Sequence, residues 1–219
     1  MSFKEKILDF FFPPRCIFCG KVMSRTGSGV CETCAKNLPF VEEGKILRKI
    51  GKYTCAVTFY YEGVVQQGIL AMKFRSRLHR AAHFAPFLAR TVAEHLGGEF
   101  DAVTYVPVHF LRRWRRGFDQ SKLLAKAAAA LWDTKILPTL YKKRNNPPQS
   151  TVKGHEARRK NVQNAYTAIH PDSFRGTRLL LIDDVVTSGQ TLIACADELL
   201  AAGAASVVCA ALSGGHPEK

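Results

Sequence analysis

The sequence is poor in acidic side chains and has no long apolar run. Its 219 residues contain 18 Asp and Glu against 32 Lys and Arg, a formal net charge of +14. This excess predicts attraction to polyanions, with a basic protein that has no polyanionic partner as the alternative. No run reaches the roughly 18 apolar residues of a membrane span, so no transmembrane segment is expected.

The N-terminus lacks the features of a signal peptide. Residues 3–12 are interrupted by charges, and no small-residue cleavage site follows them. They predict a short amphipathic helix that docks on the protein, with a helix at a membrane surface as the alternative. We therefore expect a cytoplasmic protein, either free or peripheral at the inner membrane.

Cysteine occurs at seven positions, and four of them form two Cys-x2-Cys pairs, Cys16 with Cys19 and Cys31 with Cys34. Each pair can place two thiolates on one tetrahedral zinc ion, whereas disulfides are rare in the cytoplasm. The spacing predicts structural zinc that stabilises a small module, with a redox or iron–sulfur role as the alternative. The remaining cysteines lie in apolar runs and are expected in the core: Cys55, Cys195 and Cys209.

The most informative stretch is residues 179–191, Leu-Leu-Leu-Ile-Asp-Asp-Val-Val-Thr-Ser-Gly-Gln-Thr. An apolar run before a Thr/Ser/Gly loop predicts a buried strand followed by a loop that opens a helix. Such a loop suits a phosphate, because backbone N–H groups point at it and Gly189 permits close approach. Asp183 and Asp184 are candidates for holding ribose hydroxyls or a magnesium ion. A P-loop is excluded, because Gln190 stands where that motif requires lysine.

Two basic segments accompany this stretch. In residues 112–116, four arginines flank a tryptophan, a combination that can clamp a pyrophosphate or hold single-stranded nucleic acid. Residues 142–161 are long and basic and predict a closing lid. The candidates for single-stranded DNA are Arg112, Arg113, Trp114, Arg115, Arg116, Lys142, Lys143, Arg144, Arg158, Arg159 and Lys160.

Strand and helix patterns alternate from residue 52 onward. This alternation predicts an α/β fold, a mostly parallel twisted sheet flanked by helices, with ligands at the carboxyl ends of the strands. The expected strands are 53–61, 102–108, 165–169, 178–182 and 206–212, and the expected helices are 64–74, 80–96, 120–132 and 190–202. We expect an N-terminal helix and zinc module over 1–45 and a second domain over 46–219, with a linking helix or loop at 41–50.

Residues 179–191 resemble the thirteen-residue signature of the type I phosphoribosyltransferases, which bind phosphoribosyl pyrophosphate. The resemblance implies that fold for the second domain, with magnesium bound together with the pyrophosphate. It implies that Asp183 and Asp184 contact the ribose, as the candidate catalytic residues. The candidates for the phosphate and pyrophosphate groups are Val186, Thr187, Ser188, Gly189, Gln190, Thr191, Arg112, Arg113 and Arg116.

The chain as a whole resembles the ComF family, which includes the ComFC and GntX proteins. The resemblance rests on the four-cysteine module, Pro-Val at 107–108, Arg-Arg-x-Arg-Arg-Gly-Phe-x-Gln at 112–120, Gln-x8-Arg-x2-Asn at 149–161 and the phosphoribosyl motif. It implies a role in natural transformation, with incoming single-stranded DNA and the uptake or helicase machinery at the inner membrane face as partners. The family usually has Asn where Asp119 stands, and this carboxylate predicts a local ion pair with the arginines that weakens anion binding.

Two functions from different classes follow. In the first, the chain is a ComF-like competence protein that handles incoming single-stranded DNA and binds phosphoribosyl pyrophosphate. In the second, it is an active phosphoribosyltransferase of nucleotide or cofactor metabolism with no DNA role. The net charge and the arginine cluster favour the first. No base-recognition pocket is evident, so the acceptor stays open.

Overall fold

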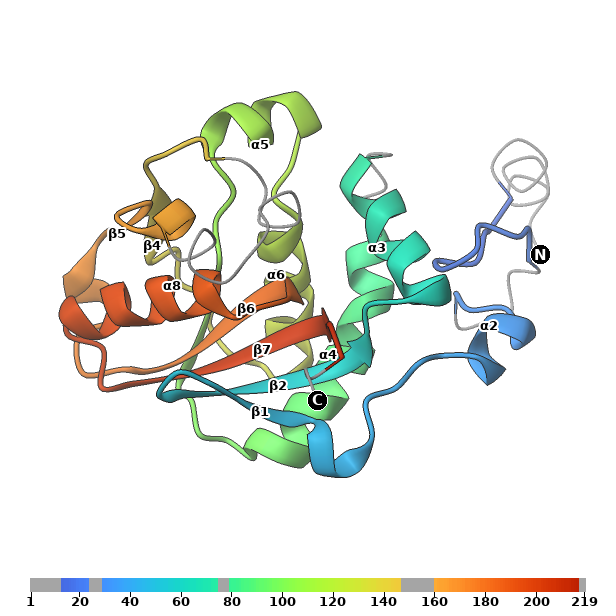
Figure 1. Cartoon of the computed structure of the whole chain (residues 1–219), viewed down its shortest axis with the longest axis horizontal. Helices are drawn as coiled ribbons and strands as arrows, with labels where there is room; N and C mark the ends of the chain where they lie inside the picture. Colours follow the sequence, from blue (N-terminus) through green and yellow to red (C-terminus); the bar gives the residue numbers. More distant parts are fainter. Residues whose placement is uncertain (1–12, 24–28, 75–78, 147–159, 217–219) are drawn as a thin grey trace.

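The computed structural model describes residues 13–23, 29–74, 79–146 and 160–216 (Figure 1). The helix expected at 3–12 lies outside these residues, as do Arg158 and Arg159. Within the described part of the chain, no helix is both long enough and apolar enough to cross a bilayer.

A five-stranded sheet forms the centre of the main domain, in the order β1-β2-β7-β6-β3. The edge strand β1 pairs antiparallel with β2, and the other neighbours are parallel. The mostly parallel sheet expected from the sequence is therefore confirmed. The strands are β1 (Leu47–Ile50), β2 (Tyr53–Tyr60), β3 (Ala102–Tyr105), β6 (Arg178–Val186) and β7 (Ser206–Gly214).

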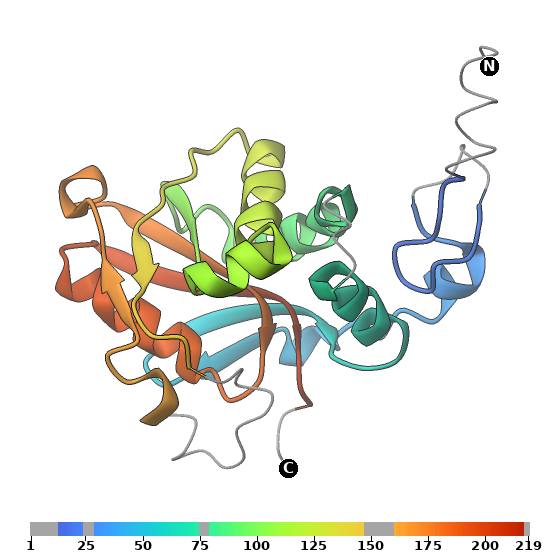
Figure 2. The same ribbon diagram turned by 90° about the horizontal axis from the view of Figure 1, so that it is seen from above.

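Helices cover both faces of this sheet (Figure 2), because its central strands are apolar on both sides. One face packs against α3 (Gly63–Phe74), α4 (His79–Leu96) and α6 (Gln120–Leu131). The other face packs against α8 (Gln190–Ala201), beside a small antiparallel sheet of β4 (Leu140–Lys142) and β5 (Tyr166–Ala168). Further helices are α2 (Glu32–Lys36), α5 (Phe110–Arg116) and the 3₁₀ turns η1 (Glu43–Lys45) and η3 (Pro171–Ser173).

Strand β6 is longer than expected, which corrects the bounds 178–182. Val185 and Val186 continue the parallel pairing, opposite Ser213 and Gly214 of β7. The two aspartates thus lie inside the end of a strand, because two β-branched residues after them extend the ladder.

Three further segments differ from the sequence-based expectation. The supposed linker at 41–50 contains η1 and the strand β1, whose Ile50 is buried. The arginine cluster forms the helix α5, which begins after His109 and ends at the left-handed Gly117. Lys142 belongs to β4, so the long basic segment begins in a strand.

Candidate functional site

The loop that joins β6 to α8, residues 186–191, brings together all six motif residues proposed for a phosphate. Gly189 is the N-cap of α8 and has no side chain with which to cap the first-turn N–H groups. A hollow of about 30 Å³ lies against the loop, and Asp183 is part of its wall. A helix N-terminus beside such a hollow suits an anion the size of a phosphate.

Gly189 is required for two structural reasons. Its φ of +73° is a left-handed conformation. A Cβ atom here would also lie 2.8 Å from Cγ2 of Ile50 in β1. The sequence suggested close approach to a phosphate, whereas the structure adds close packing against the edge strand.

The paired carboxylates of the motif lie at the end of β6, just before this loop. Asp183 and Asp184 are both buried, with 9% and 5% of their surfaces exposed. Asp183 Oδ1 accepts hydrogen bonds from Ser121 Oγ of α6, at 3.0 Å, and from the Asp184 backbone N–H, at 2.8 Å. The first carboxylate is therefore fixed in position by α6.

Asp119, the departure from the family pattern, is a buried N-cap of α6. Its Oδ2 accepts from the Val108 N–H at 2.9 Å, and its Oδ1 accepts from the Lys122 N–H at 3.1 Å. In place of the expected arginine ion pair, the carboxylate joins two backbone segments with both oxygens. Burial raises the pKa of Asp119, and the nearby charge of Asp184 raises it further.

Carboxylate oxygens are ligands that a magnesium ion prefers. Asp119 lies within electrostatic range of Asp184, and Asp183 and Asp184 are adjacent in the strand. Magnesium in phosphate sites is commonly held by one or two carboxylates plus substrate oxygens. Asp183, which lines the hollow, and its neighbour Asp184 have the carboxylates for such an ion, whereas both oxygens of Asp119 accept from backbone N–H groups.

The arginines of α5 divide into an inner and an outer set. Arg112 and Arg116 are half-buried: Arg112 donates to the Asn146 carbonyl oxygen, and Arg116 Nη1 donates to Gln120 Oε1 at 3.2 Å. Burial lowers the pKa of Arg112, and the charge of Arg116 lowers it further. The outer residues are exposed: Arg113, Trp114 and Arg115.

Lys142 of β4 lies close to Arg112 and to Asp183. Burial lowers its pKa, the charge of Arg112 lowers it further, and the charge of Asp183 opposes both effects. Its Nζ lies 5.1 Å from the ring centre of Tyr166. Lys142 therefore belongs to the site, whereas the other described lysines and arginine of this segment are exposed: Lys143, Arg144 and Lys160.

The four patterned cysteines converge at the N-terminus, and their sulfur atoms all lie within 4.8 Å of one another. Cys19 Sγ and Cys31 Sγ are 3.7 Å apart, close to the roughly 3.8 Å that tetrahedral zinc with 2.3 Å bonds requires. Burial raises the pKa of Cys16, but hydrogen bonds from backbone N–H groups, chiefly that of Cys31, outweigh it and lower the pKa to about 7. The residues fit a structural zinc ion.

Sequence comparison agrees with both parts of this arrangement. Residues 7–57 match the double zinc ribbon domain, and residues 115–219 match the phosphoribosyl transferase domain. DNA utilization protein YhgH of Salmonella typhimurium is 28% identical over 220 residues, 89% of this chain and 94% of the relative. Competence protein F of Haemophilus influenzae is 26% identical over 203 residues, 83% of this chain and 89% of the relative. The chain is thus similar to these two proteins over most of its length.

Solved structures give a more distant likeness. The allosteric regulatory enzyme of purine biosynthesis is 21% identical with a TM-score of 0.44, over 65% of this chain and 29% of that one. The chain thus spans less than a third of that enzyme's length. Adenine phosphoribosyltransferase of Leishmania tarentolae is 11% identical with a TM-score of 0.42, over 77% of this chain and 94% of that one.

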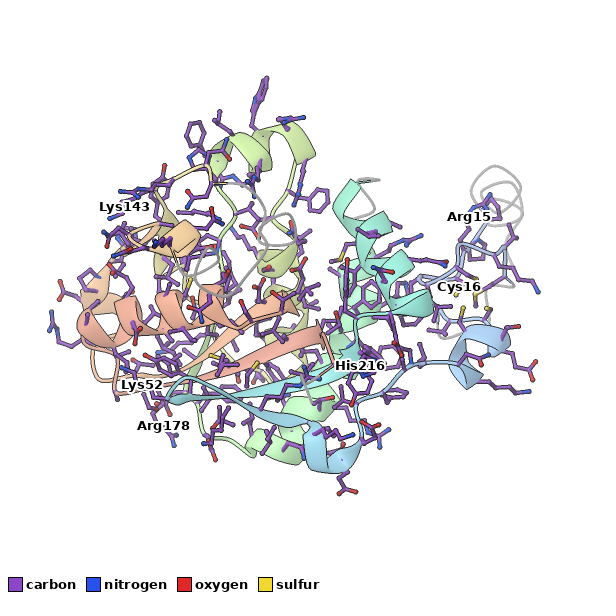
Figure 3. All side chains as sticks on the ribbon, in the orientation of Figure 1. Arg15, Cys16, Lys52, Lys143, Arg178 and His216 are labelled. Atoms are coloured by element: carbon purple, nitrogen blue, oxygen red, sulfur yellow. The ribbon has the colours of Figure 1, made fainter. Side chains whose placement is uncertain are left out.

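The zinc ribbon of this ComF-like chain is anchored in the main core by its first knuckle. Phe18, between the first two cysteines, is 2% exposed and packs edge-on against Phe84 at a centroid distance of 5.4 Å and Phe59 at 6.1 Å. Arg80 Nη1 of α4 donates to the Ile17 carbonyl oxygen at 2.7 Å. Figure 3 labels Cys16 and Arg15 on the N-terminal segment that carries the first knuckle. The metal site and the domain core are therefore physically joined.

The sequence analysis gave no role to Ser121 and Tyr166, two residues that the fold brings to the site. Ser121 directly follows the Arg-Gly-Phe-x-Gln run. Its position beside that motif could have indicated from the sequence that it belongs to the site. Tyr166 is buried at the start of β5, and the charge of Asp183 acts on it. Nothing in its local sequence distinguishes Tyr166 from a core aromatic residue.

Proposed function

We propose that this chain acts in the use of incoming DNA, as a ComF-like protein, and binds phosphoribosyl pyrophosphate together with magnesium at the end of β6. The observation that supports it most is the motif loop: a glycine-capped helix N-terminus with two buried carboxylates directly before it. The names of the relatives support the DNA role.

Each part of the ligand has a group of matching chemistry. The N–H groups of loop 186–191 donate to the 5-phosphate, and Asp183 and Asp184 accept from the ribose hydroxyls. Lys142 lies within electrostatic range of Asp183 and Arg112, and Arg112 lies within range of Arg116, so these three cations bind the pyrophosphate. Magnesium, when bound, screens the charge between carboxylates and pyrophosphate.

The domain boundary between residues 45 and 46 stays a prediction.

Removing both carboxylates tests the ribose site. We expect Asp183→Ala/Asp184→Ala to weaken phosphoribosyl pyrophosphate binding with magnesium about a hundredfold, because each hydrogen bond to a charged group contributes about 1.5 kcal/mol or more. Isothermal titration calorimetry measures the loss. Asp184→Asn keeps the side-chain shape and serves as the milder variant.

Asp172→Asn is the matched control, since its carboxylate is 92% exposed on η3 and pairs only with Arg175 in the described structure. It removes one negative charge before the amino end of β6, whereas Asp183 and Asp184 lie near its carboxyl end. Wild-type affinity in the double variant, with magnesium present and the fold intact by circular dichroism, would refute the site.

We further propose that the outer face of α5 binds single-stranded DNA. Trp114 is 83% exposed and Phe110 is 49% exposed, which is unusual for large aromatic side chains on a folded surface. Arg113 and Arg115 are exposed on the same short helix. Aromatic rings can stack on bases while the guanidinium groups contact phosphates. This helix projects from the main domain in Figure 1, so that a strand can reach it.

Substitutions on α5 should separate stacking from charge. Trp114→Ala should weaken the binding of an oligothymidylate at least about tenfold, since stacking contributes about 1–3 kcal/mol per base, and should leave the salt dependence unchanged. Arg115→Ala should lower the slope of log affinity against log salt by about one. Fluorescence anisotropy over a salt series measures both.

Arg175→Ala is the matched control for charge, because Arg175 is exposed in the turn before the amino end of β6, whereas α5 follows the carboxyl end of the parallel neighbour β3. Leu131→Ala, at an exposed position of α6, controls for loss of apolar surface. A wild type that does not bind at low salt, or a Trp114→Ala protein that binds as wild type does, would refute the DNA surface. Phosphoribosyl pyrophosphate binding without DNA binding would favour the metabolic enzyme.

A further inference from the structure

The start of α6 buries three consecutive polar side chains. Asp119, Gln120 and Ser121 have 6%, 5% and 1% of their surfaces exposed. Side chains of these types are mostly exposed in folded proteins, so a buried run of three requires an explanation. Successive side chains at a helix start point in different directions, about 100° apart. The three residues therefore reach three different parts of the structure.

Asp119 fixes the place where this turn begins. Its two oxygens join the backbone N–H of Val108, which follows β3, to the N–H of Lys122 in the first turn of α6. The turn is thus tied to the carboxyl end of β3, and β6 is the parallel neighbour of that strand. Residues 120 and 121 are therefore held beside the site by the backbone, whatever their own side chains do.

Ser121 reaches the first carboxylate of the motif. Its Oγ donates to Asp183 Oδ1 at 3.0 Å, and the same oxygen accepts from the Asp184 N–H at 2.8 Å. Two protein donors thus engage the two lone pairs of Oδ1. The χ2 torsion of aspartate is broad, so the plane of a carboxylate depends on such hydrogen bonds. Without the Ser121 hydroxyl, this plane is less firmly held.

Gln120 reaches a cation on the other side of the turn. Its Oε1 accepts from Arg116 Nη1 at 3.2 Å, across the left-handed Gly117 that separates α5 from α6. Arg116 is half-buried, whereas Gln120 is buried. An arginine side chain has several rotatable bonds, so an acceptor fixed on a helix limits where its guanidinium group lies.

We propose that Ser121 and Gln120 are positioning residues, each for a different half of the phosphoribosyl pyrophosphate site. Ser121 aligns Asp183, so that Oδ2 of this carboxylate meets a ribose hydroxyl. Gln120 aligns Arg116 with the pyrophosphate. This inference rests on the proposed function and adds to it the residues that set the geometry of the site.

One helical turn therefore holds groups of opposite charge. Adjacent residues of α6 bond a carboxylate of β6 and a guanidinium group of α5, so this turn sets the spacing between the two. Groups that are already ordered bind a ligand without the entropy cost of ordering them on association. A purely structural role would instead affect the stability of α6 and all ligands alike.

Two fragments of the ligand separate the two roles in calorimetric titrations with magnesium: ribose 5-phosphate and inorganic pyrophosphate. We expect Ser121→Ala to weaken ribose 5-phosphate binding about tenfold, a factor typical of partners that orient metal-ligating side chains, and to leave pyrophosphate binding unchanged. Gln120→Met keeps the length of the side chain but loses the acceptor. It should show the reverse pattern, and both variants should weaken binding of the intact phosphoribosyl pyrophosphate.

Ser121→Thr keeps the hydroxyl and should restore most of the affinity for ribose 5-phosphate. If the added methyl group prevents folding, the Gln120→Met titrations still test the proposal. Thr91→Val is the matched control, because it removes a buried hydroxyl that donates to the Phe87 carbonyl oxygen at 3.1 Å. Thr91 lies in the half of α4 that leads to the amino end of β3, away from the site, and its variant should bind both fragments as wild type does.

Two results would overturn the proposal while the proposed function stands. One is equal weakening of both fragments in Ser121→Ala and in Gln120→Met, which would show a structural role for the turn. The other is wild-type affinity for all three ligands in both variants, with the fold intact by circular dichroism. A wild-type protein that binds none of the three ligands would instead refute the proposed function itself.

Discussion

Cys16→Ser will remove the zinc and lower the thermal midpoint of unfolding by about 10 °C. The knuckle that holds the metal also holds Phe18 in the core, so loss of the metal releases this ring. Losing a buried phenylalanine costs about 3–5 kcal/mol, and 1 kcal/mol shifts the midpoint by about 2–4 °C in chains of this size. Calorimetry gives the midpoint, and plasma mass spectrometry gives the zinc content.

Phe18→Ala separates the metal from the anchor. We expect this variant to retain about one zinc per chain, since its thiolates are unchanged, and to lose a similar amount of stability. Phosphoribosyl pyrophosphate binding should survive in both variants, because the core around Phe18 and the core under α8 lie on opposite faces of the sheet. A Cys16→Ser protein with wild-type zinc content would contradict the metal assignment.

The sequence was sufficient to predict the main elements because they are governed by local rules. The apolar strands, the Gly-terminated helices and the two Cys-x2-Cys pairs have short-range signals, and the structure has them within a few residues of the expected bounds. The end of β6 was misplaced, since the aspartates look like a strand terminus until the pairing of Val185 with β7 is known. That pairing is a tertiary contact.

The arginine cluster shows where sequence reasoning reaches its limit. Four arginines within five residues looked like one unit, but helical geometry separates them around α5. Arg112 and Arg116, four residues apart, are half-buried, and those between them are exposed. The packing of β1 against loop 186–191 was not predictable at all, because it brings Ile50 to Gly189 across most of the domain sequence.

Gly189→Ala will destabilise the protein and weaken phosphoribosyl pyrophosphate binding together. Alanine in a left-handed conformation costs about 1–2 kcal/mol, and forcing a Cβ against Ile50 adds about 1–3 kcal/mol. Ile50 is buried and β-branched, so it cannot move aside easily. The loop must shift instead, and we expect affinity to fall more than about tenfold as its N–H groups lose the phosphate.

Gly98 is the matched control, because it has φ of +83° at the end of α4 and nothing within 4 Å of an added Cβ. Gly98→Ala should show only the conformational cost, about 1–2 kcal/mol in urea denaturation, with unchanged ligand affinity. Asparagine tolerates the left-handed region, so Gly98→Asn should be milder still. Gly189→Asn should remain as damaging as Gly189→Ala, because Ile50 meets the Cβ itself. A Gly189→Asn protein with wild-type stability would show that β1 does not constrain the loop.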